Sequence, residues 1–199
     1  MKDLHISRRQ VLHGAGAVSI IGVLAIPTTM FAKETDSRDR TRHMNLHFAA
    51  LSTAASPGAK GVVLMAGDGM FTSSHVQGHG IYEHIDPTTP KPNAILHAGT
   101  WMTTSLVSFT SIGIYGLQAS GILTMKVDLV QEIPSPAVMP ATLTVVCNIP
   151  FAPLITGRDE GFSLEAPFGL FEPETPTVGI TIFSTVDEES TGHSHHESG

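Results

Sequence analysis

The chain has few of the residues on which recognisable active sites are usually built. Its 199 residues include one cysteine, one tryptophan and two tyrosines. The lone Cys147 excludes an intramolecular disulfide and cysteine-ligated haem or iron–sulfur centres. There is no Gly-x-Ser-x-Gly elbow, no phosphate-binding glycine loop ending in Lys-Ser or Lys-Thr, and no His-Glu-x-x-His. No catalytic motif is therefore identifiable. The sequence assigns no catalytic residues to an enzymatic function.

Basic residues are also scarce. From Gly61 onward there are three, Lys91, Lys126 and Arg158, against fourteen acidic residues. Phosphate backbones and anionic lipid surfaces attract clustered lysine and arginine, so nucleic acid is excluded as a partner and an anionic membrane surface is a poor one. A blue-copper site is excluded too, because no histidine follows Cys147 before His193.

An export signal is predicted at the N-terminus. The run Ser7-Arg8-Arg9-Gln10-Val11-Leu12-His13 resembles the twin-arginine pattern Ser-Arg-Arg-x-Phe-Leu-Lys, and Arg8 and Arg9 carry the resemblance. The uncharged stretch Gly14 to Pro27 follows, and a polar segment reaches Ala32, which is the layout of a secretory signal. The resemblance implies that the twin-arginine export machinery is a partner and that the protein crosses the cytoplasmic membrane folded. The expected location is periplasmic, extracellular or at the cell surface.

Membrane contact is expected only transiently during export, or through an uncleaved signal anchor. Residues 14–27 are too few and too rich in glycine and alanine for a convincing span, which needs about 20 strongly apolar residues. Without residues 1–32 about 165 residues remain, which is enough for one domain.

The remaining chain divides into three predicted segments. Residues 33–60 begin with the mixed-charge run Lys33 to Arg42 and form a linker, in which Met44 to Ala55 is expected to make at most a short helix. Residues 61–186 form a β-domain. Residues 187–199 form an acidic, disordered tail whose His193, His195 and His196 can chelate divalent metals weakly.

The β-domain is predicted from period-2 alternation. Leu123, Met125, Val127 and Leu129 alternate with polar residues in 122–130, and 142–149 repeats the pattern with Cys147 on the apolar face. Gly67-Asp68-Gly69 has the composition of a turn, and the proline-rich link 134–140 is expected to cross between sheets. About eight such runs predict an all-β fold, a single antiparallel barrel or sandwich.

A metal site is one hypothesis for the function. His79, Glu83, His84 and His97 form the densest group of potential ligands for Zn or Cu in the body of the chain. If residues 78–86 are a strand, His79 and Glu83 point to one face and His84 to the other, so one ion cannot reach all of them. Two subsets stay open: His79 with Glu83, or His84 with His97 from a neighbouring strand. In the alternative interpretation, His84 bonds a backbone carbonyl and Glu83 faces water.

A ligand cavity is a further hypothesis. Trp101, the only tryptophan, and Tyr82 are candidates for the rim of a barrel that closes over a small apolar or sugar ligand. The alternative is that these aromatics fill the core. Gly78-His79-Gly80-Ile81-Tyr82 and Gly99-Thr100-Trp101 resemble two strands of the small secreted barrels of the dirigent and allene-oxide-cyclase type, which implies a barrel but carries over no catalytic residue.

These observations favour an exported β-domain with a binding or structural role in the cell envelope. A metal-binding protein or metal-dependent enzyme, and a barrel for a small ligand, are the alternatives.

Overall fold

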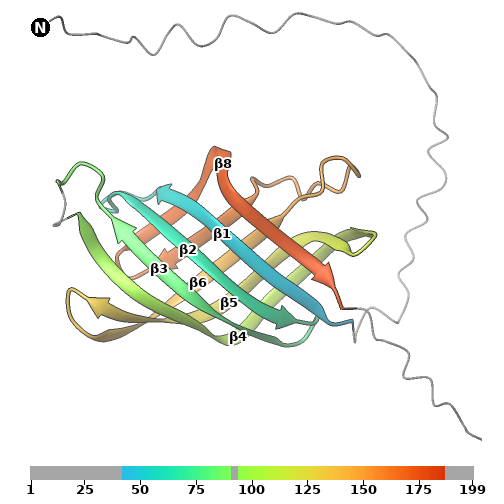
Figure 1. The fold of residues 1–199 in the computed structure, drawn as a ribbon, viewed down its shortest axis with the longest axis horizontal. Coiled ribbons are helices and arrows are strands. Elements are labelled where there is room, and N and C mark those ends of the chain that lie inside the picture. Colours follow the sequence, from blue (N-terminus) through green and yellow to red (C-terminus); the bar gives the residue numbers. More distant parts are fainter. Residues whose placement is uncertain (1–41, 91–93, 187–199) are drawn as a thin grey trace, which may run out of the picture. The chain divides into compact units, whose positions relative to one another are not determined.

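The protein is a closed antiparallel β-barrel in a computed structural model that describes residues 42–90 and 94–186. The predicted signal with Arg8 and Arg9, and the histidine-rich tail, lie outside these residues. Neighbouring strands pair in sequence order, as Figure 1 shows. The eight strands are β1 (Met44–Ala54), β2 (Val62–Phe71), β3 (Val76–Ile85), β4 (Ile95–Tyr115), β5 (Gln118–Ile133), β6 (Ala137–Cys147), β7 (Gly161–Ala166) and β8 (Gly169–Thr185).

Two sets of pairings close the barrel. β1 pairs with β8 along most of its length, from Met44 opposite Thr185 to Ala54 opposite Phe171. The short β7 lies between β6 and β8, and where it ends β5 pairs directly with β8, Ala119 opposite Phe183. Closure pairs most strands on both sides, whereas β4 beyond Met102 pairs with β5 alone among the described residues. The predicted all-β fold of about eight strands is confirmed, in its barrel form.

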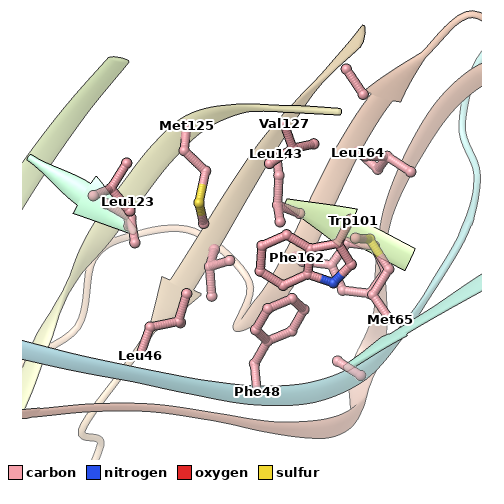
Figure 2. Close-up of a cluster of buried hydrophobic side chains, with 14 of the residues drawn as sticks. Leu46, Phe48, Met65, Trp101, Leu123, Met125, Val127, Leu143, Phe162 and Leu164 are labelled. Atoms are coloured by element: carbon pink, nitrogen blue, oxygen red, sulfur yellow. The ribbon is translucent and has the colours of Figure 1, made fainter. Parts of the chain in front are cut away.

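The interior is filled with apolar side chains from alternate positions of the strands (Figure 2). The ring of Phe48 packs against those of Trp101 and Phe162, with centroid distances of 5.8 and 5.9 Å respectively. Trp101 is only 1% exposed, and its Nε1 donates a hydrogen bond to the carbonyl oxygen of Ala66 at 3.1 Å. Packed interiors of this kind leave little room for a ligand.

Three local expectations were wrong. Residues 44–54 are β1 and not a helix, because Met44, Leu46, Phe48 and Ala50 alternate inward with period 2. The domain therefore begins at Met44 and not at residue 61. Gly67-Asp68-Gly69 lies inside β2, and the link after β5 closes a hairpin in which Gln131 pairs with Ala137.

Candidate functional site

Strand β3 divides the predicted metal ligands between the two sides of the barrel wall. His79 and Glu83 point outward, whereas Tyr82 and His84 point inward and are buried. The predicted alternation is therefore confirmed. His79 pairs in register with Asp68, whose carboxylate contacts Nδ1 of His47. His79 and Glu83, on the outside of the barrel wall, therefore have different neighbours from His84, which is on the inside.

His84 and His97 come together at one end of the barrel. This contact was expected for one of the two predicted subsets of metal ligands. They are opposite each other on β3 and β4, and their rings stack with centroids 5.3 Å apart. His84 Nε2 donates a hydrogen bond to the carbonyl oxygen of Lys60 at 2.6 Å, and His97 Nδ1 is 2.6 Å from Oε1 of Gln131. Burial lowers the pKa of His84, so its imidazole is held neutral.

The four predicted ligands do not converge on one point. Across residues 42–90 and 94–186, no three His, Cys, Asp or Glu side chains are grouped closely enough to hold a metal ion. The space beside the two stacked histidines is taken by Phe168, whose ring centroid lies 4.9 Å from that of His84 and 4.6 Å from that of His97. This arrangement matches the alternative interpretation, in which His84 bonds a backbone carbonyl.

Tyr82 and Trp101 belong to the core rather than to a rim. Tyr82 is 3% exposed, and burial raises the pKa of its hydroxyl, which has no hydrogen-bond partner among the described residues. Phe48 packs against Trp101, and Phe162 packs against Phe48, among the buried side chains of the core (Figure 2). Neither aromatic side chain closes over an opening, so the structure places both where the alternative interpretation expected them.

Cys147 is buried and unavailable as a nucleophile, as its place in the apolar alternation predicted. Its thiol donates to the carbonyl oxygen of Thr181 at 3.4 Å, and burial raises the pKa of the thiol. A protonated, enclosed thiol is unreactive.

A concave surface on the outside of the barrel forms a groove with a volume of about 740 Å³. We call it the outer groove. It crosses β8, β1, β2, β3 and β4 between two rows of outward side chains paired from strand to strand. One row is Val178, Leu51, Leu64, Glu83 and Ala98, and the other is Ala49, Ala66, Ile81 and Thr100.

The shape of the outer groove follows from small residues in its walls and buried ones in its floor. Ala50, Met65 and Tyr82 lie between the two rows and are buried, so their main chain forms the floor together with Gly99. The short side chains of Ala49, Ala66 and Ala98 leave the walls shallow. The longer side chains of Leu64 and Ile81 project beside them and are 39% and 63% exposed. Exposed apolar surface gathered in one hollow is typical of a binding site.

One end of the outer groove is acidic. Glu83 pairs with Ala98 across β3 and β4, and Glu132 occupies a bulge in β5 beside the same alanine, because Ala98 pairs with Ile133 while Gly99 pairs with Gln131. Both glutamates line the groove. At the opposite end the lining is Val178, Gly179, Leu51 and Ala49, which carry no charge.

In comparisons with protein-family models, curated proteins and solved structures, none matches this chain. Within the part of the chain that the structure describes, no helix is long and apolar enough to cross a membrane.

Of the residues predicted from the sequence, Glu83 and Tyr82 line the outer groove, and the rest of its lining was missed. A signal was present: residues 62–66 are apolar without interruption, so both faces of that strand carry apolar side chains where a half-exposed strand alternates. Which outward residues share a row depends on strand register, and the sequence alone does not show it.

Proposed function

We propose that the protein is an exported binding module that holds a small, predominantly apolar ligand in the outer groove. The observation that carries the proposal is the groove itself, about 740 Å³ in volume and lined mainly by aliphatic side chains with a few polar ones. Small-molecule sites in proteins commonly have volumes of roughly 300–1,000 Å³ and this kind of lining. Export is part of the proposal and rests on the twin-arginine resemblance around Arg8 and Arg9.

The lining supports binding rather than catalysis. The outer groove is lined by no cysteine, histidine or serine, and its accessible reactive groups are two carboxylates and the hydroxyl of Thr100, which has no histidine in the lining to act as a base. Cys147 and His84 are enclosed on the inner side of the barrel wall. A ligand in the groove would therefore meet apolar contacts and negative charge, but no activated side chain.

The test is to fill the outer groove. Ala66 stands in the middle of one wall, and an Ala66→Trp side chain would occupy space that the ligand needs. With the neutral fluorescent probe N-phenyl-1-naphthylamine, we expect saturable binding to the native protein and a dissociation constant raised at least tenfold in the variant. This change corresponds to about 1.4 kcal/mol of binding free energy. The measurement is a fluorescence titration.

Thr110→Trp is the matched control, because Thr110 is an exposed β4 residue outside the groove lining. It adds the same indole elsewhere on the barrel and should leave the dissociation constant within about twofold. Circular dichroism melts show whether both variants are folded. Equal binding by native protein and a folded Ala66→Trp variant, or no binding by the native protein, would contradict the proposal.

A further inference from the structure

We infer that the ligand of the outer groove is a cationic amphiphile: a single apolar chain that lies along the groove, with a positively charged headgroup between Glu83 and Glu132. This inference rests on the proposed function and goes beyond it, because it assigns the charge and orientation of the occupant. Its basis is the division of the groove into an aliphatic part and an acidic end.

The two carboxylates are placed to share one cation. Glu83 is on β3 and Glu132 on β5, and the methyl group of Ala98 on β4 lies between them. Strands are about 4.8 Å apart, so the two backbones are separated by roughly 10 Å, which two glutamate side chains and a headgroup can span. A larger residue at position 98 would separate the two acids, whereas alanine leaves the space between them open.

Neither carboxylate is neutralised within the described part of the chain. The contact found there between an acidic and a basic side chain joins His47 to Asp68, and no hydrogen bond within residues 42–90 and 94–186 involves the side chain of Glu83 or Glu132. The same ranges contain ten acidic residues against four basic ones, Arg42, Lys60, Lys126 and Arg158. The potential at this end of the groove is therefore negative and favours a cation over an anion of equal size.

Other occupants fit these observations less well. An extended peptide would need free main-chain groups to pair with, and where β1, β2, β3 and β4 line the groove each strand already pairs with a neighbour on both sides. A second copy of the chain would bring a like-charged surface against Glu83 and Glu132, which opposes association. A single-chain amphiphile needs only apolar contact and one charge.

The test compares probes that share a chain and differ in the headgroup. Decyltrimethylammonium, decyl maltoside and decanoate, each below its micelle concentration, are titrated into the native protein by isothermal calorimetry. We expect the cation to bind roughly three- to tenfold more tightly than the neutral maltoside, because solvent-exposed charge pairs contribute modestly. The anion should bind most weakly, and the preference should shrink as salt is raised.

The variant for this test is the double change Glu83→Gln and Glu132→Gln. It should remove the preference for the cation and leave maltoside binding within about twofold. Its control is Glu172→Gln with Glu174→Gln, which removes the same charge from β8 positions outside the groove lining and should keep the preference. The pair of variants separates local recognition from the effect of net charge.

The outcomes are distinguishable. If all three probes bind with equal affinity, or if the glutamine variant keeps the preference, the assignment of a cationic headgroup is overturned while the apolar groove remains a binding site. If the maltoside does not bind either, the proposed function fails with it. If sedimentation velocity shows a stable oligomer that binds none of the probes, the groove is an interface between copies and both are overturned.

Discussion

Trp101 lies against strands whose backbone leaves no room for side chains. Its indole is on the inner side of the wall that carries the outer groove, across Gly67 and Gly80. A Cβ at Gly67 would be 2.2 Å from Cζ2 of Trp101, and a Cβ at Gly80 would be 2.0 Å from the carbonyl oxygen of Ala66. These glycines therefore allow the indole to approach the wall closely, which explains why Gly67 occurs inside a strand and does not mark a turn.

Gly80→Ala should destabilise the barrel by about 2–4 kcal/mol, because the new methyl group meets a backbone oxygen that cannot move without breaking sheet pairing. The measurement is urea unfolding followed by the fluorescence of Trp101, the only tryptophan in the chain.

Gly78→Ala is the matched control on the same inward face of β3. Its Cβ would meet the carbonyl oxygen of Asp68 at 3.2 Å and Trp101 at 3.5 Å, so small shifts accommodate it. We expect a change within about 1 kcal/mol, part of it a gain from the stiffer unfolded chain. Equal losses in the two variants would show that the backbone at Gly80 is packed no more closely than at Gly78.

Among the elements, the connection between β6 and β7 is bridged by the side chain of Asn148. Asn148 Nδ2 donates to the carbonyl oxygen of Arg158 at 3.0 Å, and its Oδ1 accepts from the backbone N–H of Thr156 at 2.8 Å. Ser120 on β5 adds a contact, with its hydroxyl 2.7 Å from the carbonyl oxygen of Leu154. The amide therefore links both sides of this long loop.

Asn148→Ala should loosen the loop without unfolding the barrel. We expect faster amide hydrogen exchange in residues 150–158, while the global free energy of unfolding falls by less than about 1.5 kcal/mol, the usual contribution of a hydrogen bond. Asn148→Asp keeps the acceptor for Thr156 and loses the donor to Arg158, so its exchange should be intermediate. Unchanged exchange in both variants would mean that the backbone alone holds the loop.

The sequence predicted elements where apolar and polar residues alternate and failed where they do not. The runs inside β5 and β6 were predicted because their inward and outward residues differ in polarity. β1 was missed because Ala49 and Leu51 are apolar residues that point outward, into the outer groove. They interrupt the alternation of apolar and polar residues. The feature that hid the strand is part of the candidate site.

The site was less predictable than the fold for a related reason. Glu83, Ala98 and Glu132 come from three strands, and their proximity depends on register and on the bulge at Ala98. Local pattern carries little information on either. His84 and His97 were predicted as a pair on adjacent strands, and the structure confirms that they meet, but Phe168 and Gln131 occupy the positions beside them.

For the whole molecule, the burial of His84 predicts a dependence of stability on pH. The groups that act on His84 are the carbonyl of Lys60, His97 on β4 and Asp86 after β3, and burial is the dominant influence, lowering the pKa of His84. In the unfolded chain a histidine titrates near pH 6.5, so the unfolded state takes up a proton before the folded state does. The stabilisation is complete above about pH 6.5 and is lost as the pH falls towards the pKa of the folded state.

His84→Phe should flatten this dependence. The phenyl ring can stack against Phe168 and His97 as the imidazole does, but it loses the hydrogen bond to Lys60 and takes up no proton. Between pH 6.5 and 5 the native protein should lose more unfolding free energy than the variant, by at most about 1.4 kcal/mol per pH unit for one proton. His75→Gln, at an exposed position, should follow the native curve. If His84→Phe also follows the native curve in urea unfolding, His84 is not the buried neutral group that makes the barrel sensitive to acid.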